Sequence, residues 1–302
     1  MTVTRPDIVE YGPRRRRWVG IVVVAGLLAV PLFGLLYGRA DPPPPPAAEP
    51  TPSTATSPPP ATVNAVFPRP RGDGATRTIS VTFPDGAKAT VTYPAGLRLA
   101  ELGVRPHIGA VLTRPGEEAE FRQLTAPYRG EADVARGGPM IRHLTDDVTL
   151  WPGPPGAPAA GDVLLFAFGR WRIALQDEPD GLNFDERRIW ARALRGRVTR
   201  DGFLVLSARS PLRLARPGEV YDEVVAGPQL WIGGGGGPLI VLTPTPDCAR
   251  RAIEPSAVRN RPGRTGETCQ GEVHVAASGE PEFVRQVLEE VRVRMGTRVT
   301  DG

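Results

Sequence analysis

One uncharged stretch constrains this chain more than any other feature, because it is long enough to cross a bilayer. Residues Trp18 to Tyr37 read WVGIVVVAGLLAVPLFGLLY. As an α-helix this stretch would span about 30 Å, the thickness of the hydrocarbon core. The arginines at 14–17 directly precede it, and positive charge stays on the cytoplasmic side. We therefore expect a basic cytoplasmic tail over 1–17, a transmembrane helix over 18–37 and an extracytoplasmic remainder.

A cleaved signal peptide is the alternative to an anchor. Gly38-Arg39-Ala40 offers small residues for a cleavage site after Ala40. The apolar core of a signal peptide is usually about 7–15 residues, shorter than this segment, which favours the anchor. Both alternatives export the rest of the chain. The predicted location is the cell membrane, with the C-terminal domain outside.

A proline-rich stalk is predicted over 38–75. It begins DPPPPPAAEPTPSTATSPPP, a composition that cannot bury a core and favours extended polyproline II. At about 3.1 Å per residue, a stretch of about 30 residues reaches about 90 Å. The stalk is interpreted as a spacer between the membrane and the domain at 76–302.

The distribution of charge argues against a nucleic-acid partner. The net charge is +4, and the tail at 1–17 supplies most of it with five arginines against Asp7 and Glu10. The outer domain is therefore nearly neutral, without the basic excess that attracts DNA or RNA. Lys88 is the only lysine, so a bias towards arginine runs through the whole chain and weakens any single arginine as a sign of function.

The pattern of the outer domain predicts an α+β fold with a mixed or antiparallel sheet and two helices. Alternating residues at 78–83 and 89–93 flank Asp85-Gly86, which is typical of a hairpin. A second hairpin is expected at 163–168 and 171–175. Helices are predicted over 184–195, capped by Asn183, and over 281–294. Further strands are expected at 108–113, 118–124, 140–150, 203–207, 220–225, 229–232, 239–243 and 272–276.

A weak internal echo leaves two domain organisations open. Arg197-Val198-Thr199 follows a hairpin and a helix, and Arg298-Val299-Thr300 follows a strand and a helix. Two tandem α+β halves, divided near 197–202, would produce this echo. Chance is the alternative, because these residue types are common in the chain.

Cys248 and Cys269 are the only cysteines, and outside the membrane a pair predicts a disulfide. The loop between them is expected to be irregular, with prolines at 255 and 262. It is rich in arginine, so it is a candidate surface for an envelope protein or an anionic envelope component. The candidate partner-binding residues are Arg250, Arg251, Arg259, Arg261 and Arg264.

No motif in the chain predicts a catalytic, cofactor or metal site. The glycines at 233–237 are followed by Pro238 and not by the Gly-Lys-Ser/Thr of a phosphate loop. The acidic stretch at 177–183 fails the ligand spacing of a calcium loop. His143, Asp146 and Asp147 alternate along a predicted strand and would not converge.

Two stretches resemble a group of actinobacterial single-pass membrane proteins of unknown function. They are FPDGAKATVTYPAGLRLAELGVRP and RIWARALRGRVTRDGFLVLSA, together with the arginine-flanked anchor and its stalk. The resemblance covers most of 76–250. It implies the topology and a shared domain, and it carries no activity or ligand.

The sequence thus predicts a membrane-anchored extracytoplasmic binding or interaction protein of the cell envelope. A cell-envelope enzyme with an unrecognised site is one alternative. A structural subunit of an envelope or secretion complex is another.

Overall fold

The computed structural model describes residues 63–116, 119–156, 160–179, 181–250, 255–259 and 261–296. The predicted tail, the hydrophobic segment and residues 38–62 of the predicted stalk lie outside the described residues. Within the described part, no helix has the length and apolar character needed to cross a bilayer. The folded part begins by Asn64, whose side-chain amide donates to the carbonyls of Pro127 and Arg172.

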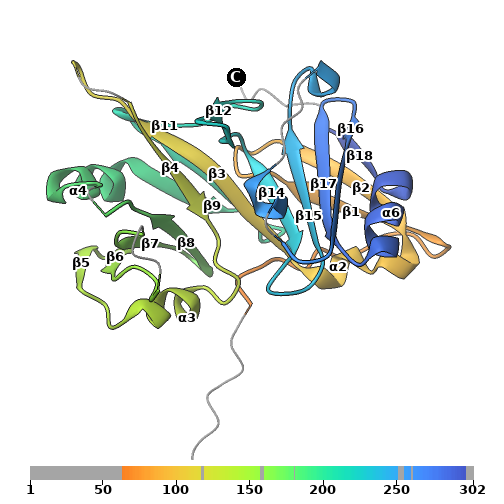
Figure 1. Ribbon diagram of the computed structural model, residues 1–302, viewed down its shortest axis with the longest axis horizontal. Helices are drawn as coiled ribbons and strands as arrows, with labels where there is room; N and C mark the ends of the chain where they lie inside the picture. The colour runs from red at the N-terminus through yellow and green to blue at the C-terminus, as the bar shows by residue number, and fades with distance from the viewer. Residues whose placement is uncertain are drawn as a thin grey trace, which may run out of the picture. The chain divides into compact units, whose positions relative to one another are not determined.

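The described chain is α+β and mainly antiparallel sheet, as predicted (Figure 1). Its largest sheet has eleven strands, and β11 pairs with the C-terminal end of β3 beside the main path. In order across the sheet, the strands are β16 (Arg264–Gln270), β17 (Val273–Gly279), β15 (Leu239–Pro244), β14 (Gln229–Gly233), β3 (Val104–Leu112), β4 (Glu120–Thr125), β8 (Trp171–Gln176), β7 (Val163–Phe168), β6 (Val148–Trp151) and β5 (Arg142–Thr145), with β11 at Leu212–Leu214.

The strands follow the same connection pattern on both sides of the central β14–β3 pair. Outward from β3 come β4, β8 and β7, and outward from β14 come β15, β17 and β16. The hairpin β7–β8 leads into α4 (Phe184–Ala193) and β9 (Leu194–Val198). The hairpin β16–β17 leads into α6 (Pro281–Glu290) and β18 (Arg292–Met295). β18 pairs with β2, which precedes β3, and β9 pairs with β10, which precedes β14.

The smaller elements complete the described chain. The second sheet contains β1 (Thr76–Thr82), β2 (Lys88–Pro94) and β18, and two-stranded ladders join β9 to β10 (Leu204–Ala208) and β12 (Val220–Tyr221) to β13 (Val224–Val225). The short helices are η1 (Ala95–Leu97), α2 (Leu99–Leu102), α3 (Glu131–Val134), η2 (Ala135–Gly137), η3 (Cys248–Arg250) and α5 (Ser256–Arg259).

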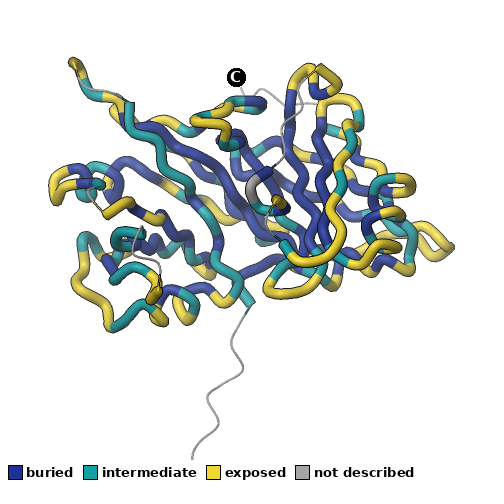
Figure 2. Tube along the Cα trace, viewed as in Figure 1, coloured by how far each residue is buried: buried dark blue, intermediate teal, exposed yellow. Residues whose placement is uncertain are grey.

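The main core lies between one face of the large sheet and a layer made of α4, α6 and the small sheets. Trp190 of α4 and Val287 of α6 are buried in the same cluster as Ile108 of β3 and Val91 of β2. Figure 2 shows the central strands buried along most of their length, with exposed residues gathered in the connecting loops. The opposite face carries smaller apolar clusters, and short elements such as α3 and α5 pack there.

Local chemistry explains the elements that the sequence predicted well. Gly86 has φ +89° in the turn of the β1–β2 hairpin, a conformation that glycine adopts at little cost. Asn183 accepts hydrogen bonds from Asp185 N and Glu186 N, and the Glu186 carboxylate accepts from Asn183 N. This capping box fixes the start of α4 at the predicted residue.

The structure corrects several predicted boundaries. The helix predicted over 184–195 ends at Ala193, because Leu194–Val198 pairs with β10, and the strand predicted over 220–225 is the hairpin β12–β13. The last helix ends at Glu290 and not at 294, because Val293 and its neighbours pair with β2 as a strand. The strand predicted over 140–150 is a hairpin, since Asp146 and Asp147 form the turn between β5 and β6. Residues 264–270, predicted as part of an irregular loop, form strand β16 on β17.

Candidate functional site

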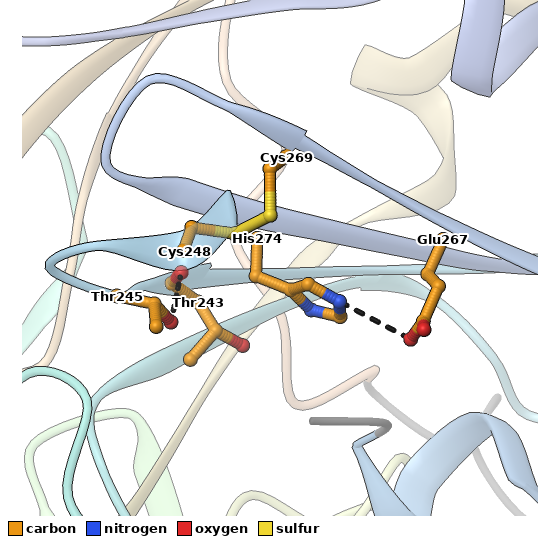
Figure 3. Close-up of a disulfide and its surroundings, with 6 residues drawn as sticks. All are labelled: Thr243, Thr245, Cys248, Glu267, Cys269 and His274. Carbon is orange, nitrogen blue, oxygen red and sulfur yellow. Dashed lines mark hydrogen bonds and ion pairs between the residues drawn. A yellow bond between two sulfur atoms is a disulfide. The ribbon is translucent and has the colours of Figure 1, made fainter. Parts of the chain in front are cut away.

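The predicted disulfide is present and fastens the arginine-rich segment to the large sheet. Cys248 in η3 bonds to Cys269 in β16, with 5.8 Å between their Cα atoms (Figure 3). Cys248 is buried, while the residues after it, Ala249 and Arg250, are exposed. The bond therefore anchors one end of an exposed segment to a strand of the sheet.

A short row of side chains lies beside the disulfide on the same face of the sheet. His274 of β17 is paired in register with Cys269 of β16 and Thr243 of β15. The imidazole Nε2 lies 3.2 Å from Oε2 of Glu267. Figure 3 marks this contact with a dashed line. Burial lowers the pKa of His274, while Glu267, whose side chain is 42% exposed, opposes that shift. Nε2 is the donor in this contact, because a carboxylate oxygen accepts.

Thr243 completes this row with an unused polar atom. Thr243 is 1% exposed, and its hydroxyl has no hydrogen-bond partner among the described residues. Its carbonyl accepts from the hydroxyl of Thr245 at 3.1 Å. A nucleophilic hydroxyl would need a hydrogen bond to the imidazole and access to a substrate. Thr243 has neither here, because Nε2 of His274 is taken by Glu267 and the hydroxyl is buried.

The structure separates the predicted arginines into two groups. Arg250, Arg259 and Arg264 are exposed in η3, α5 and the start of β16. Arg261 is half-buried and is hydrogen-bonded within the domain. Its Nε donates to Ser278 Oγ at 2.9 Å, and its guanidinium also donates to the carbonyl of Gly237. Arg251 lies outside the described residues. Three of the five side chains are thus exposed, whereas Arg261 is engaged within the fold.

A second polar cluster, which sequence reasoning missed, lies further along the same face. Arg105 of β3 is 6% exposed and donates to the carbonyls of Ala126 and Gly233 at 2.8 and 2.9 Å. Its guanidinium carbon lies 5.3 Å from the ring centroid of Tyr128 and 5.6 Å from that of Trp231. Burial lowers the pKa of Arg105 to about 10. Carbonyl dipoles and aromatic faces therefore take the place of a carboxylate partner.

His107, two residues after Arg105 on β3, is part of the same cluster. Its ring stacks on Trp231, with centroids 4.6 Å apart and an interplanar angle of 14°. Burial, with a smaller contribution from Arg105, lowers the pKa of His107 to about 3. Its Nδ1 has no hydrogen-bond partner among the described residues. The only sequence signal for these two residues is their alternation with Val104, Pro106 and Ile108.

The glycine run forms the connection between β14 and β15 and packs on the Arg105 cluster. A Cβ at Gly234 would lie 2.7 Å from Nη2 of Arg105, and one at Gly235 would lie 2.9 Å from the Tyr128 ring. Both residues have positive φ. Glycine is thus required here for close packing as well as for the turn.

The remaining candidates do not gather into a site. His143 lies on β5, with Asp146 and Asp147 in the following turn, and all three are exposed. Asp177 is instead a buried structural carboxylate, which accepts from Leu182 N and pairs with Arg122 and Arg187. Across the residues that the structure describes, no group of His, Cys, Asp and Glu side chains is arranged to hold a metal ion.

Comparison with known proteins adds nothing to this geometry. Neither the family models, nor the curated proteins, nor the solved structures contain a match to the chain. The resemblance to actinobacterial single-pass membrane proteins therefore stays a prediction from the sequence.

Proposed function

We propose that this protein is a membrane-anchored, extracytoplasmic binding protein of the cell envelope. The observation that carries the proposal is the disulfide between Cys248 and Cys269, which fastens η3 to strand β16, with Arg250 exposed in η3 and Arg259 exposed in the following helix α5. Disulfides persist in oxidising compartments outside the cytoplasm. Arginine fixed on a rigid base recognises carboxylate and phosphate groups at a low cost in side-chain entropy. The partner is an envelope protein or an anionic envelope component.

The membrane part of this proposal is supported by the chain before the domain. Trp18 to Tyr37 is uncharged and follows four arginines, and a proline-rich stretch separates it from Asn64. This order would hold the binding segment away from the bilayer on a spacer. A fusion of alkaline phosphatase after Gly302 would test the orientation. Enzymatic activity in intact cells is expected, and an inactive, cytoplasmic fusion would reject it.

Site-specific photo-crosslinking in cells of the native host tests the binding segment. A benzophenone side chain would replace Arg250 or Arg259 in the full-length protein. A matched control would place it at Arg292, which is exposed on β18 in the opposite layer. We expect discrete adducts from positions 250 and 259 and none from 292. Equal adduct patterns at all three positions, or none at any, would reject this segment as the contact.

We further propose that the domain consists of two tandem halves of one repeated unit. The first runs from β2 to β9, and the second from β10 to β18. Support comes from the matching strand order on both sides of β14–β3. The four-residue sequence Leu97-Arg98-Leu99-Ala100 recurs at 212–215, but this recurrence does not support the division, because the first copy forms helical turns and the second lies mostly in strand β11.

Fragment complementation tests this division. The chain would be cut in the turn after β9, between Arg200 and Asp201. If the two halves are units that close each other through β9–β10 and β2–β18, co-expressed fragments 1–200 and 201–302 should purify together. Recovery of either fragment alone as a folded monomer would reject the reciprocal pairing.

A further inference from the structure

A groove lies beside α4, on the opposite face of the large sheet from the disulfide-fastened segment. It runs between the helix and the turn that follows β10, and its volume is about 370 Å³. Ligand pockets for small molecules begin at about 300 Å³. The groove is therefore large enough for one small organic group.

Three arginines and one carboxylate, Asp185, line this groove. Arg188 and Arg192 are four residues apart, so they project from the same side of α4. Arg209 reaches the groove from the turn, where its backbone N–H donates to the carbonyl of Ala193 at 3.1 Å. The aliphatic surface between them comes from Ile189, Ala193 and Pro211. The groove thus combines polar walls, in which three arginines outnumber the single carboxylate of Asp185, with an apolar floor.

The positive charge of the groove is largely uncompensated. Within the described part of the chain, the side chains of Arg192 and Arg209 form no ion pair and no hydrogen bond. Arg188 lies 3.8 Å from Asp185, whose side chain is 86% exposed, and such pairs contribute little. Guanidinium groups stay protonated at all physiological pH values. An anion entering the groove would therefore meet two guanidinium groups, those of Arg192 and Arg209, whose side chains have no polar partner among the described residues.

The topologically equivalent helix provides an internal comparison. A groove beside α6 has a volume of about 450 Å³ and is also lined by two arginines, Arg264 and Arg285. There Arg285 is paired with Glu282 at 2.6 Å and with Glu289 at 2.5 Å. The α6 groove is thus neutralised by its own carboxylates. The α4 groove has one carboxylate, Asp185, beside three arginines, whereas the α6 groove has two carboxylates, Glu282 and Glu289, beside two arginines.

We propose that the α4 groove binds phosphate esters, a role beyond the proposed contact at the disulfide-fastened segment. Guanidinium groups donate paired hydrogen bonds to phosphate oxygens. A phosphate monoester presents three acceptor oxygens, which suits three arginines better than the two oxygens of a carboxylate do. The apolar floor of Ile189, Ala193 and Pro211 would contact the carbon atoms of the esterified group.

Calorimetric titration of the full-length protein in nanodiscs tests this assignment. Glucose 1-phosphate is the probe, and glucuronate is the carboxylate comparison. Arg192→Ala/Arg209→Ala should weaken binding of glucose 1-phosphate at least tenfold. The control Arg292→Ala/Arg294→Ala removes the same charge from exposed positions on β18 and should change affinity less than twofold. Glucose 1-phosphate should also bind more tightly than glucuronate.

Several results would overturn the proposal. They are the absence of binding to the unaltered protein, equal losses in the two double variants, and equal affinity for glucuronate. Arg192→Lys/Arg209→Lys keeps the positive charge but removes the planar guanidinium groups. It provides a second test in case the alanine variant does not fold. A well-folded lysine variant with unchanged affinity would reject guanidinium recognition.

The same assay distinguishes a lipid source of the phosphate from a soluble or polymeric one. Dihexanoyl phosphatidic acid, used below its micellar concentration, carries the same monoester on a lipid. Tighter binding of dihexanoyl phosphatidic acid than of glucose 1-phosphate, measured by displacement, would assign the site to a lipid headgroup. Weaker displacement would assign it to a sugar or polyol phosphate.

Discussion

The carboxylate of Asp177 lies 3.2 Å from Nε of Arg122, and the side chains are 0% and 10% exposed. The same carboxylate pairs with Arg187 at 3.3 Å and accepts from Leu182 N. It therefore joins β4, the end of β8 and the start of α4 in one buried network. A carboxylate so placed stabilises the fold only while all of its partners are present.

Replacing Asp177 by alanine should lower the free energy of unfolding by about 3–5 kcal/mol, because two guanidinium groups would lose their buried partner. The control is Glu178→Ala. Glu178 lies 3.7 Å from Arg122, but its side chain is 72% exposed, so a loss of less than about 1 kcal/mol is expected. Urea unfolding followed by circular dichroism measures both. Equal losses would show that the network is not the source of stability.

Adding one methyl group to the glycine run should separate packing from backbone strain. Gly235 and Gly236 have φ of +66° and +102°, but only at Gly235 would a Cβ meet other atoms, those of the Tyr128 ring. Gly235→Ala should therefore be less stable than Gly236→Ala by about 1–3 kcal/mol, the usual cost of overpacking. Thermal unfolding of the two variants provides the comparison. Equal midpoints would mean that the ring moves aside freely.

Removal of the disulfide should destabilise the domain through its unfolded state. Cys248 and Cys269 are 21 residues apart, so their bond restricts a loop of that size. Cys248→Ser/Cys269→Ser should reduce the free energy of unfolding by about 3 kcal/mol. Addition of a reductant to the unaltered protein should produce the same change and should not affect the double variant. A further loss in the reduced double variant would contradict this account.

Acid should destabilise the protein through its buried histidines. The pKa of His107 is about 3 in the fold, below the ordinary value of 6.5. Between these two values the unfolded chain binds a proton that the folded chain does not. Stability should therefore be fully present above pH 6.5 and fall by about 1.4 kcal/mol per pH unit below it. The lowered pKa of His274 acts in the same direction.

Urea unfolding at several pH values isolates the share of His107. His107→Gln should reduce the slope of stability against pH between about 4 and 6. His143→Gln, at an exposed position on β5, is the control and should leave the slope as it is. An unchanged slope in His107→Gln would place the acid sensitivity in other groups.

The elements that could be predicted have their determinants close together in the chain. The β1–β2 turn depends on Asp85 and Gly86, the start of α4 on Asn183 and Glu186, and the disulfide on two residues in a chain with no other cysteine. Each signal lies within a few residues of the feature it causes. Local physical chemistry is then sufficient for the prediction.

The missed elements depend on distant partners. β16 lies at the edge of the large sheet, so its residues are mostly exposed and carry no apolar alternation. Arg105 can be buried only because Ala126, Gly233 and Trp231 provide carbonyls and an aromatic face. The helix predicted to 294 ends at Glu290 because β2, which is two hundred residues earlier in the chain, offers a free edge. No local pattern contains this information.

The pairing of β18 with β2 has a consequence for how the domain is made. Val293 is opposite Val91, so nearly the whole domain must be available before this ladder can close. Contacts of such long sequence separation form late and slow the folding of a chain. A chain delivered from its N-terminus would therefore keep an open edge on β2 until residues 292–295 arrive. A chain that stops before Arg292 would leave the β2 edge of the first hairpin without its partner strand β18. That unpaired edge would be prone to pair with a strand of a neighbouring molecule.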